Sequence, residues 1–334
     1  MRIAVLGTGR IGRMHADNLV QHADTELAMV YDVDRASAEA VAERHSVRAA
    51  ASAEEVFAAS EVDAVLVATA TPTHADYIEA AVAAGKPVLC EKPIDLSLAR
   101  VNETARRIAG ADVPIQIGFN RRFDPGHAKA RARAHAGEIG DIHQVVITSR
   151  DPEMPPRAYY EAAGGLLRDM TIHDFDLARF MLPEEPAHVF ASASRLIDPA
   201  LMSELGDHDT AMIVMTTASG RQCCINNSRT AVYGYDQRVE ILGTTGMLVS
   251  DNVRADNVRR HGKDETEAGS PYLYFFIERY RQAFFAELDA FVAAVREGRP
   301  TSPGFEDGRL ALVLAEAAYR SLAERRAVAV EEIT

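Results

Sequence analysis

A glycine-rich sequence near the N-terminus has the spacing of a dinucleotide-binding loop. Gly7, Gly9 and Gly12 form a G-x-G-x-x-G sequence, in which Arg10 and Ile11 occupy the last two variable positions. The sequence follows an apolar, strand-like run and leads into a helical pattern, which is the context that this motif needs. The glycines permit a tight turn, close approach of a pyrophosphate to the backbone, and close packing of helix on strand. The N-terminus of the helix favours phosphate through its unpaired N–H groups and its dipole.

Asp32 is the residue that selects between the two nicotinamide cofactors. It stands twenty residues after Gly12, at the end of the apolar run 27–31. A carboxylate at this place can accept hydrogen bonds from the adenosine ribose hydroxyls and would repel a 2′-phosphate. Arg35 lies close by in sequence, and its guanidinium could partly accommodate that phosphate. The pattern predicts NAD as the cofactor, in preference to NADP.

Lys92 and the pair Asp169 and His173 could carry proton-transfer chemistry. Lys92 follows the expected strand 87–90, at the carboxyl end where ligands bind in open α/β sheets. Asp169 and His173 are four residues apart, so on one helix they share a face with Asp176. An ordinary surface lysine and a solvated helix face would explain the same patterns, so position alone leaves both interpretations open.

The elements that would hold these residues fall into two groups, of which the first alternates strands and helices. The expected strands are 2–6, 26–32, 64–68, 87–90 and 115–118, and the expected helices are 10–21, 35–45, 74–84 and 97–109. Ser52 followed by Glu55 has the spacing of a capping box that starts another short helix. The strands are short and apolar throughout, as in parallel sheets that are buried on both faces. This alternation predicts a doubly wound parallel sheet of the Rossmann type.

After about residue 120 the pattern changes to consecutive strands. They are expected at 143–150, 187–195, 209–217, 221–229, 237–242, 246–250 and 327–331, with helices at 125–136, 164–182, 275–297 and 305–325 and loops at 151–160 and 251–270. Successive strands without long helices between them indicate a large, mostly antiparallel sheet flanked by helices. We therefore predict an NAD-binding domain over 1–120 and a substrate-binding and oligomerisation domain over 121–334.

Composition limits the class of protein further. The 334 residues include 36 basic and 49 acidic ones, a net charge of −13, which disfavours a nucleic-acid partner. Three cysteines (Cys90, Cys223 and Cys224) are too few for a disulfide framework, and a metal site of Asp169, His173 and Cys90 lacks the ligand spacing of convincing metal sites. No apolar signal region or uncharged run of about 18 apolar residues is present. We expect a cytoplasmic protein without a metal or a membrane span.

Several further segments occur together along the chain. They are Thr69–His74 (T-A-T-P-T-H), Glu91-Lys92-Pro93, Gly118–Asp124 (G-F-N-R-R-F-D) and Gly164–Asp176 (G-G-L-L-R-D-M-T-I-H-D-F-D). With the glycine motif, they resemble the glucose–fructose oxidoreductase, inositol dehydrogenase and rhizopine-catabolism family (Gfo/Idh/MocA), and the inositol 2-dehydrogenase branch in particular. The resemblance covers nearly the whole chain, including Tyr233–Asp236.

The resemblance implies that Lys92, Asp169 and His173 form the catalytic group. Oxidation of a secondary alcohol requires loss of the hydroxyl proton, and a neutral histidine such as His173 is suited to be the base. Lys92 can stabilise negative charge on the reacting oxygen, and Asp169 can keep Lys92 protonated. A proton relay through Lys92 is the alternative. The implied nicotinamide contacts are Thr69, Thr71, His74, Glu91 and Lys92, and the implied polyol contacts are Lys92, Asn120, Arg121, Asp151, Asp169, His173 and Tyr235.

The expected activity is NAD-dependent oxidation of a cyclic polyol, namely myo-inositol to scyllo-inosose. An aldose or scyllo-inositol dehydrogenase, or a reductase of the same family, is an alternative, because fold and cofactor motifs do not determine the substrate. A non-catalytic NAD-binding sensor is a second alternative, against which the intact group of Lys92, Asp169 and His173 argues. The family also implies a homo-oligomer, a dimer or tetramer, formed through the C-terminal sheet.

Overall fold

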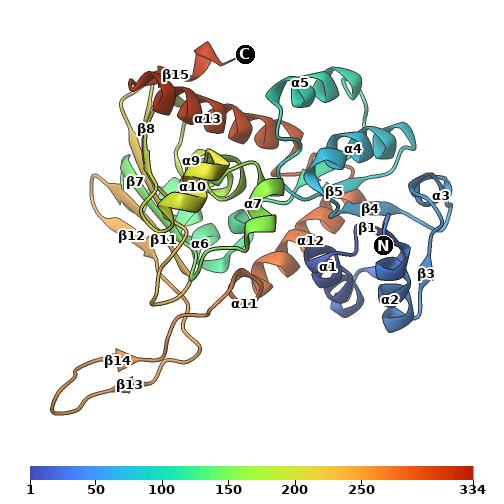
Figure 1. Ribbon diagram of the computed structural model, residues 1–334, viewed down its shortest axis with the longest axis horizontal. Helices are drawn as coiled ribbons and strands as arrows, with labels where there is room; N and C mark the ends of the chain where they lie inside the picture. The colour runs from blue at the N-terminus through green and yellow to red at the C-terminus, as the bar shows by residue number, and fades with distance from the viewer. Residues whose placement is uncertain (334) are drawn as a thin grey trace. The chain divides into compact units, whose positions relative to one another are not determined.

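Short apolar runs in the first 120 residues form a parallel sheet in the computed structural model, which describes residues 1–333 and all their side chains except those of residues 161 and 162. The strands are β1 (Arg2–Leu6), β2 (Glu26–Tyr31), β3 (Arg48–Ala49), β4 (Ala64–Val67), β5 (Val88–Cys90) and β6 (Ile115–Ile117). Their order across the sheet is β3-β2-β1-β4-β5-β6 (Figure 1). The predicted doubly wound sheet is therefore confirmed. The pattern misses only β3, because two residues are too few to show a periodicity.

Helices separate these strands as the sequence pattern predicts. They are α1 (Arg10–Gln21), α2 (Arg35–His45), α3 (Ala53–Ala58), α4 (His74–Ala83) and α5 (Leu98–Arg107), with a 3₁₀ turn η1 (Thr71–Thr73) before α4. The hydroxyl of Ser52 accepts a hydrogen bond from the backbone N–H of Glu55, so α3 begins at its expected cap. The carboxyl ends of β1 and β4 lie where the strand order reverses, which is where ligands bind in such sheets.

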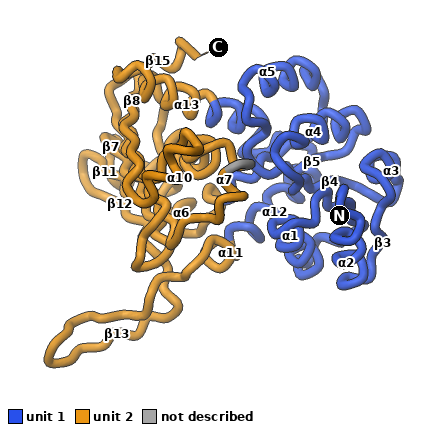
Figure 2. The backbone as a smooth tube through the Cα atoms, in the orientation of Figure 1, with its two compact units in different colours: residues 1–120, 283–312 blue, residues 121–282, 313–334 orange. Residues whose placement is uncertain are grey.

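A helix from the C-terminal part of the sequence packs against this first sheet. The chain divides into two compact units, residues 1–120 with 283–312 and residues 121–282 with 313–334 (Figure 2). Most of α12 (Arg281–Glu297) belongs to the first unit, because Leu288 and Phe291 are buried in the same apolar cluster as Ile3 and Leu19. Helix α12 thus completes the cover of the sheet, although its sequence lies far from the other elements of the unit.

The second unit is built on a seven-stranded mixed sheet. Its strands are β7 (Ile142–Arg150), β8 (Pro186–Ser194), β9 (Thr210–Thr217), β10 (Gln222–Ser228), β11 (Asp236–Gly243), β12 (Met247–Ser250) and β15 (Val328–Ala329). They are arranged in the order β12-β11-β7-β10-β9-β8-β15. Only β7 and β10 pair in parallel, and the other neighbours are antiparallel. The predicted mostly antiparallel sheet is confirmed.

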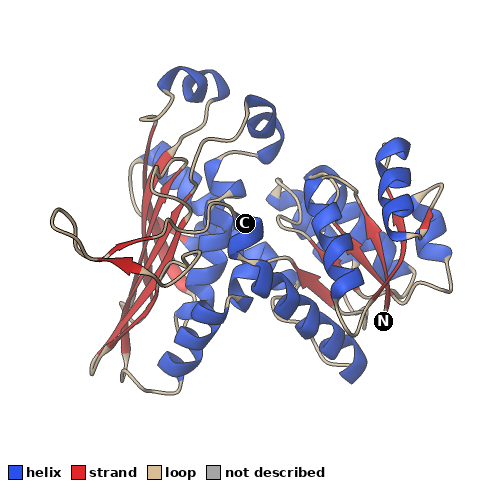
Figure 3. Ribbon diagram, turned by 90° about the horizontal axis from the view of Figure 1, so that it is seen from below, coloured by secondary structure: helices blue, strands red, loops and turns tan. Residues whose placement is uncertain are grey.

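Helices of the second unit lie on one side of its sheet (Figure 3). They are α6 (Pro125–His135), α7 (Arg157–Ala163), α8 (Leu166–Asp169), α9 (Thr171–Met181), α10 (Pro199–Leu205), α11 (Phe276–Arg279) and the later part of α13 (Phe305–Glu324), with 3₁₀ turns η2 (Asn120–Phe123) and η3 (Val330–Glu332). Strand residues alternate in burial, so that Ile213 and Ile225 are fully buried while Val214 is 43% exposed. One face of the sheet therefore forms the core, and the other carries exposed apolar side chains.

Three expectations about local structure are wrong. The single helix expected over 164–182 is two helices, α8 and α9, that break at Met170, next to Thr171, whose hydroxyl donates a hydrogen bond to Oδ1 of Asn227 on β10. The helix expected over 275–297 is likewise divided into α11 and α12. Part of the loop expected at 151–160 belongs to α7, which ends at two glycines of positive φ, Gly164 and Gly165.

The segment 251–270, which we expect to be a loop, forms a projecting hairpin. Its two short strands are β13 (Arg259–Arg260) and β14 (Ala268–Gly269), and they pair only with each other. The hairpin extends from the second unit on the side of the sheet opposite to the helices (Figures 1 and 3). Its exposed residues include Val253 and Val258.

Candidate active site

The three glycines of the cofactor motif differ in what a side chain would contact at each position. Gly7 has φ of +95°, and a Cβ atom there would lie 2.4 Å from the carbonyl oxygen of Ala68. A Cβ atom at Gly12 would lie 1.9 Å from the carbonyl oxygen of Gly7, so α1 can begin at this turn only with glycine. At Gly9, by contrast, a Cβ atom would meet nothing within 4 Å. The space over Gly9 at the start of α1 therefore fits a pyrophosphate.

The carboxylate of Asp32 is held against this loop. Its Oδ2 atom accepts hydrogen bonds from the backbone N–H of Thr8 at 2.6 Å and from the Thr8 hydroxyl at 3.0 Å, and its Oδ1 atom accepts one from the N–H of Asp34 at 2.9 Å. Arg35 is engaged elsewhere, because its Nε lies 2.6 Å from Glu39 Oε1 and its Nη1 donates to the carbonyl of Ala50. Asp32, whose carboxylate can accept hydrogen bonds from ribose hydroxyls, is thus held in place at the loop, whereas Arg35 is bonded to other groups.

The loops after β4 and β5 are fastened to each other by His74. Its Nδ1 lies 2.8 Å from the carbonyl oxygen of Pro93 and its Nε2 lies 3.0 Å from that of Thr69. The ring is buried, and burial lowers the pKa of His74. A neutral ring can donate to only one of the two carbonyls. Through these contacts His74 links the two loops. A contact between His74 and the nicotinamide stays a prediction. Thr69 lies in the same loop, where its hydroxyl is 2.7 Å from that of Thr73.

Glu91 and Lys92 follow β5 directly. Glu91 Oε1 lies 2.7 Å from the Nε2 atom of His15 on α1, which ties the end of β5 to the helix that follows the glycine loop. The next peptide bond, between Lys92 and Pro93, is cis. A Cβ atom at Gly118 would come within 3.0 Å of Glu91 Oε2, so the end of β6 packs closely on this carboxylate. Glu91 and Lys92 are both half-buried, at the strand end where the sequence places them.

In the second unit, Asp169 lies in a cluster of charged groups. Its Oδ1 accepts a hydrogen bond from the hydroxyl of Tyr159, and its Oδ2 accepts one from Nη2 of Arg229, both at 2.8 Å. The Nη1 atom of Arg229 reaches Oδ2 of Asp151 at 3.2 Å. One guanidinium, itself 2% exposed, therefore joins two predicted site residues, Asp151 and Asp169. His173 follows Asp169 by four residues in the sequence and lies on α9.

Parallel pairing of β7 and β10 brings Asp151 and Arg229 together. Arg150, the last residue of β7, pairs with Ser228, the last residue of β10, so the next residue of each strand emerges at the same edge. Asp151 N–H then donates to the carbonyl of Ser228. Sequence analysis misses Arg229 and Tyr159, because neither belongs to a motif and the pairing that places Arg229 is not visible in a strand pattern.

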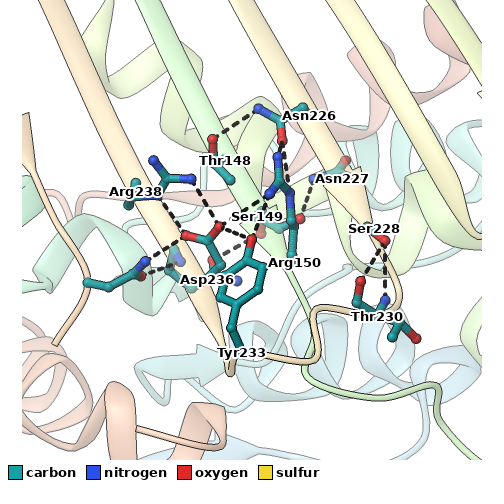
Figure 4. A network of polar contacts seen from close by, with 12 residues as sticks. Thr148, Ser149, Arg150, Asn226, Asn227, Ser228, Thr230, Tyr233, Asp236 and Arg238 are labelled. Atoms are coloured by element: carbon teal, nitrogen blue, oxygen red, sulfur yellow. Dashed lines mark hydrogen bonds and ion pairs between the residues drawn. The ribbon is translucent and has the colours of Figure 1, made fainter. Parts of the chain in front are cut away.

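The loop that carries Arg229 is fastened to the sheet by polar contacts (Figure 4). Tyr233 accepts a hydrogen bond from Arg150 Nη1 at 2.6 Å and donates one to Asp236 Oδ2 at 2.7 Å. Asp236 is fully buried and also pairs with Arg238. The segment 229–235 between β10 and β11 is therefore anchored at its far end.

Three further predicted polyol contacts are buried, namely Asn120, Arg121 and Tyr235. Arg121 lies 4% exposed, and its Nη1 donates to Asp174 Oδ1 at 2.6 Å and to the Ser149 hydroxyl at 2.8 Å. Tyr235 packs edge-on against Tyr280. Asn120 is buried at the start of η2. Asp176, which shares a predicted face with His173, instead forms a two-bond ion pair with Arg122 and holds α9 to η2.

Burial sets the electrostatics of this region. It raises the pKa of Asp151, with Asp169 adding to the rise and Arg229 opposing it. Burial also raises the pKa of Tyr160 to about 12, and its ring lies 5.5 Å from the guanidinium carbon of Arg229. The cluster is thus rich in carboxylate oxygens, which are good acceptors for hydroxyl groups.

Two further types of site were searched for along residues 1–333. No group of three or more His, Cys, Asp or Glu side chains there could hold a metal ion. No helix in the same range is both long and apolar enough to cross a membrane.

Comparisons with known proteins give consistent results over the full chain. Residues 1–119 match an oxidoreductase family with an NAD-binding Rossmann fold, and residues 127–249 match the GFO/IDH/MocA C-terminal domain. The chain is 42% identical to the inositol 2-dehydrogenase of Rhizobium meliloti (99% of each chain) and 44% identical to the myo-inositol 2-dehydrogenase of Thermotoga maritima (100% of this chain, 99% of the other). A crystal structure of Lactobacillus casei scyllo-inositol dehydrogenase with bound NAD(H) and scyllo-inositol has a TM-score of 0.91 at 28% identity, covering 99% of both chains.

Proposed function

This chain belongs to the Gfo/Idh/MocA oxidoreductase family, and from that premise we propose that it oxidises myo-inositol at C2 to scyllo-inosose. It is an NAD-dependent oxidoreductase of the inositol dehydrogenase type, as the sequence motifs predict. The observation that carries the choice of substrate is the similarity to inositol dehydrogenases across both units, rather than across the cofactor-binding part alone. The following residues carry the proposed reaction.

Backbone groups of the glycine loop hold the cofactor. The open space over Gly9 accepts the pyrophosphate, and Asp32 accepts hydrogen bonds from the adenosine ribose. Selectivity for NAD over NADP follows from the same anchored carboxylate, which repels a 2′-phosphate while Arg35 is paired with Glu39. When bound, the nicotinamide supplies the chemistry of hydride acceptance.

Three side chains act on the alcohol. Neutral His173 takes the hydroxyl proton, and the ammonium of Lys92 donates a hydrogen bond that stabilises negative charge on the reacting oxygen. Asp169, fixed by Tyr159 and Arg229, orients these groups. Together with Asp151, Asn120, Arg121 and Tyr235, it forms the polyol-binding set, in which carboxylate oxygens accept hydrogen bonds from the ring hydroxyls.

A polyol screen tests this function. The purified protein is assayed for NADH formation with myo-inositol, scyllo-inositol, glucose and xylose, at neutral and alkaline pH, and each assay is repeated with NADP. We expect the highest kcat/KM with myo-inositol and NAD. Preference for scyllo-inositol or an aldose would replace the substrate within the same enzyme class, and no turnover with any of the four would support a non-catalytic NAD-binding protein.

The uncovered face of the second sheet is the proposed contact between copies of the chain. Met212 is 62% exposed, Val249 is 52% exposed and Phe190 is 45% exposed, and strand register puts all three on one face of the sheet, opposite to the buried core face. Large exposed apolar side chains gathered on one face of a sheet are typical of a protein–protein contact. The hairpin of β13 and β14 projects on the same side of the sheet, where it can reach a second copy (Figure 3). A dimer or tetramer would cover both features.

Sedimentation velocity at micromolar concentration tests this assembly. We expect an oligomer that Met212→Glu dissociates, because a charge in a buried apolar contact is costly. Val20→Glu is the matched control, since Val20 is also half-exposed, at 51%, but lies on α1 of the first unit. A monomer for the unmodified protein, or equal effects of the two substitutions, would contradict the assembly.

A further inference from the structure

Arg229 is the residue of the site that no sequence motif indicates. It is the first residue after β10, it is 2% exposed, and its backbone N–H donates to the carbonyl of Asp209. Its side chain reaches into the cluster with Nη2 on Asp169 and Nη1 on Asp151. A buried arginine with two carboxylate partners from separate elements is fixed in one orientation.

The two carboxylates differ in what else holds them. Asp169 has a second partner, the hydroxyl of Tyr159, so each of its oxygens has a defined donor. Asp151 is 21% exposed in its side chain, and the guanidinium is the cation that it contacts. The cluster carries one positive charge for two negative ones in a buried setting. Arg229 is therefore the group that allows both carboxylates to stay ionised side by side.

We propose that Arg229 is a positioning residue for alcohol oxidation: its guanidinium bridges Asp151 and Asp169, holds Asp169 toward His173 in one orientation, and keeps both carboxylates available as acceptors for substrate hydroxyls. This inference rests on the proposed function for its link to turnover. The bridge itself rests only on the contacts of the second unit.

Several charged and titratable groups face the bridge from different elements. Tyr159 and Tyr160 come from α7, Asp169 from α8, and Asp151 from the end of β7, while Arg121, Asp174 and Asp207 are the next charged groups outward. Arg121 already pairs with Asp174, and Asp207 accepts from the backbone N–H of Leu166. Arg229 is thus the cation that serves the Asp151 and Asp169 pair.

Substitutions of Arg229 separate its charge from its shape. Arg229→Met removes both. It should lower kcat/KM on the order of 100-fold, because even a small displacement of a catalytic group lowers the rate by about this factor. The acid limb of the pH profile of kcat/KM for Arg229→Met should move to higher pH, because two neighbouring carboxylates without a cation bind a proton more readily. Arg229→Lys keeps the charge but not the fork, so it should lower kcat/KM while leaving the acid limb in place.

A matched control comes from a second buried ion pair of the same unit. Arg122 forms two hydrogen bonds with Asp176, and both side chains are at most 8% exposed. Arg122→Met should therefore destabilise the fold to a comparable extent without moving the acid limb. NAD(H) affinity, measured by fluorescence titration, should be unchanged in the Arg229 variants.

A measurement that does not need turnover keeps the inference separate from the proposed function. The melting temperature of Arg229→Met is compared at pH 5 and pH 8 with that of the double variant Arg229→Met, Asp151→Asn. Loss of the cation raises the pKa of the carboxylate pair in the folded state, so the stability deficit should grow as pH rises above the ordinary carboxyl range. Asp151→Asn removes one negative charge and should restore much of the stability at pH 8.

Each outcome decides one question. A pH-dependent deficit that Asp151→Asn repairs supports the charge bridge, even if the unmodified protein oxidises no polyol and the proposed function fails. An equal deficit at both pH values, with no repair, overturns it. If the unmodified protein is active, an unchanged acid limb in Arg229→Met, or a shift of the same size in Arg122→Met, overturns the positioning role.

Discussion

The candidate site residues of the first unit and those of the second unit are held in different ways. In the first unit, the cofactor loop depends on what its glycines lack: side chains at Gly7 and Gly12 would collide with backbone atoms, and the space over Gly9 is open. In the second unit, the proposed substrate-binding residues depend on buried charges, with Arg229 between Asp151 and Asp169 and Arg121 on Asp174. A backbone cradle binds what every dinucleotide shares, whereas a set of fixed charges can distinguish one polyol from another.

Lys92→Ala tests the one cation of the first unit to which we assign a part in the chemistry, and it should have the largest effect. Loss of a donor to the reacting oxygen should lower kcat about 1,000-fold, because such a group acts on charge that develops in the transition state. NAD affinity should stay nearly unchanged, since backbone groups carry it. Stopped-flow turnover and NAD titration measure the two quantities.

The control for this variant is Lys86→Ala. Lys86 lies in the same unit, where its ammonium donates to the carbonyls of Ala59 and Val62. Its loss should affect stability but not kcat. Near-normal turnover in Lys92→Ala would remove the catalytic assignment of Lys92.

Substitution of two neighbouring glycines tests the backbone cradle directly. Gly12→Ala places a Cβ atom 1.9 Å from a backbone oxygen, so it should lower the melting temperature of the NAD-free protein by about 5 °C or more. The Cβ atom of Gly9→Ala would meet nothing within 4 Å, so this variant should leave the melting temperature unchanged. It should lower the affinity for NAD about 10-fold. Differential scanning fluorimetry with and without NAD distinguishes the two. Equal melting temperatures for both variants would contradict the close approach at Gly12.

The same contrast explains how far the sequence could predict the molecule. The glycine motif, Asp32 and Lys92 lie in short contiguous segments, so their spacing is visible directly, and the parallel sheet follows from regular alternation of strands and helices. Arg229 reaches Asp151 only because β7 and β10 pair in parallel within an otherwise antiparallel sheet, which no local pattern encodes. The break at Met170 also depends on tertiary contacts, since Thr171 donates to Asn227 on β10. Asp176 was placed beside His173 by periodicity, yet its partner is Arg122.

Asp32→Ala tests the carboxylate beside the backbone cradle. It should lower the affinity for NAD about 10-fold. It should also bring the kcat/KM values for NAD and NADP closer together, because the repulsion of a 2′-phosphate is lost. The hydrogen bonds from Thr8 to Asp32 are lost as well, so Asp32→Asn is the better-matched variant for the loop itself. Steady-state kinetics with both cofactors measures the ratio. An unchanged preference for NAD would exclude a role of Asp32 in cofactor selection.

A charge cluster at the surface of the first unit gives the smallest effect and sharpens the contrast with the buried charges of the second. Glu79 on α4 pairs with Arg100 and Arg107 and accepts a hydrogen bond from Thr104, and these groups lower its pKa to about 2 against the opposing cost of burial. A carboxyl with a lowered pKa stabilises the fold above its ordinary pKa of about 4.5, and that contribution is lost as the pH falls toward 2. Glu79→Gln should therefore destabilise the protein at pH 7 by only about 1 kcal/mol, since solvent partly screens a network that is open at Arg107. The deficit should shrink below pH 4. This is the same direction as the deficit expected for Arg229→Met, which also grows with pH but continues to grow above the ordinary carboxyl range. Urea unfolding at pH 7 and pH 3.5 measures it, and a deficit that is constant with pH would show that Glu79 acts through packing rather than through its charge.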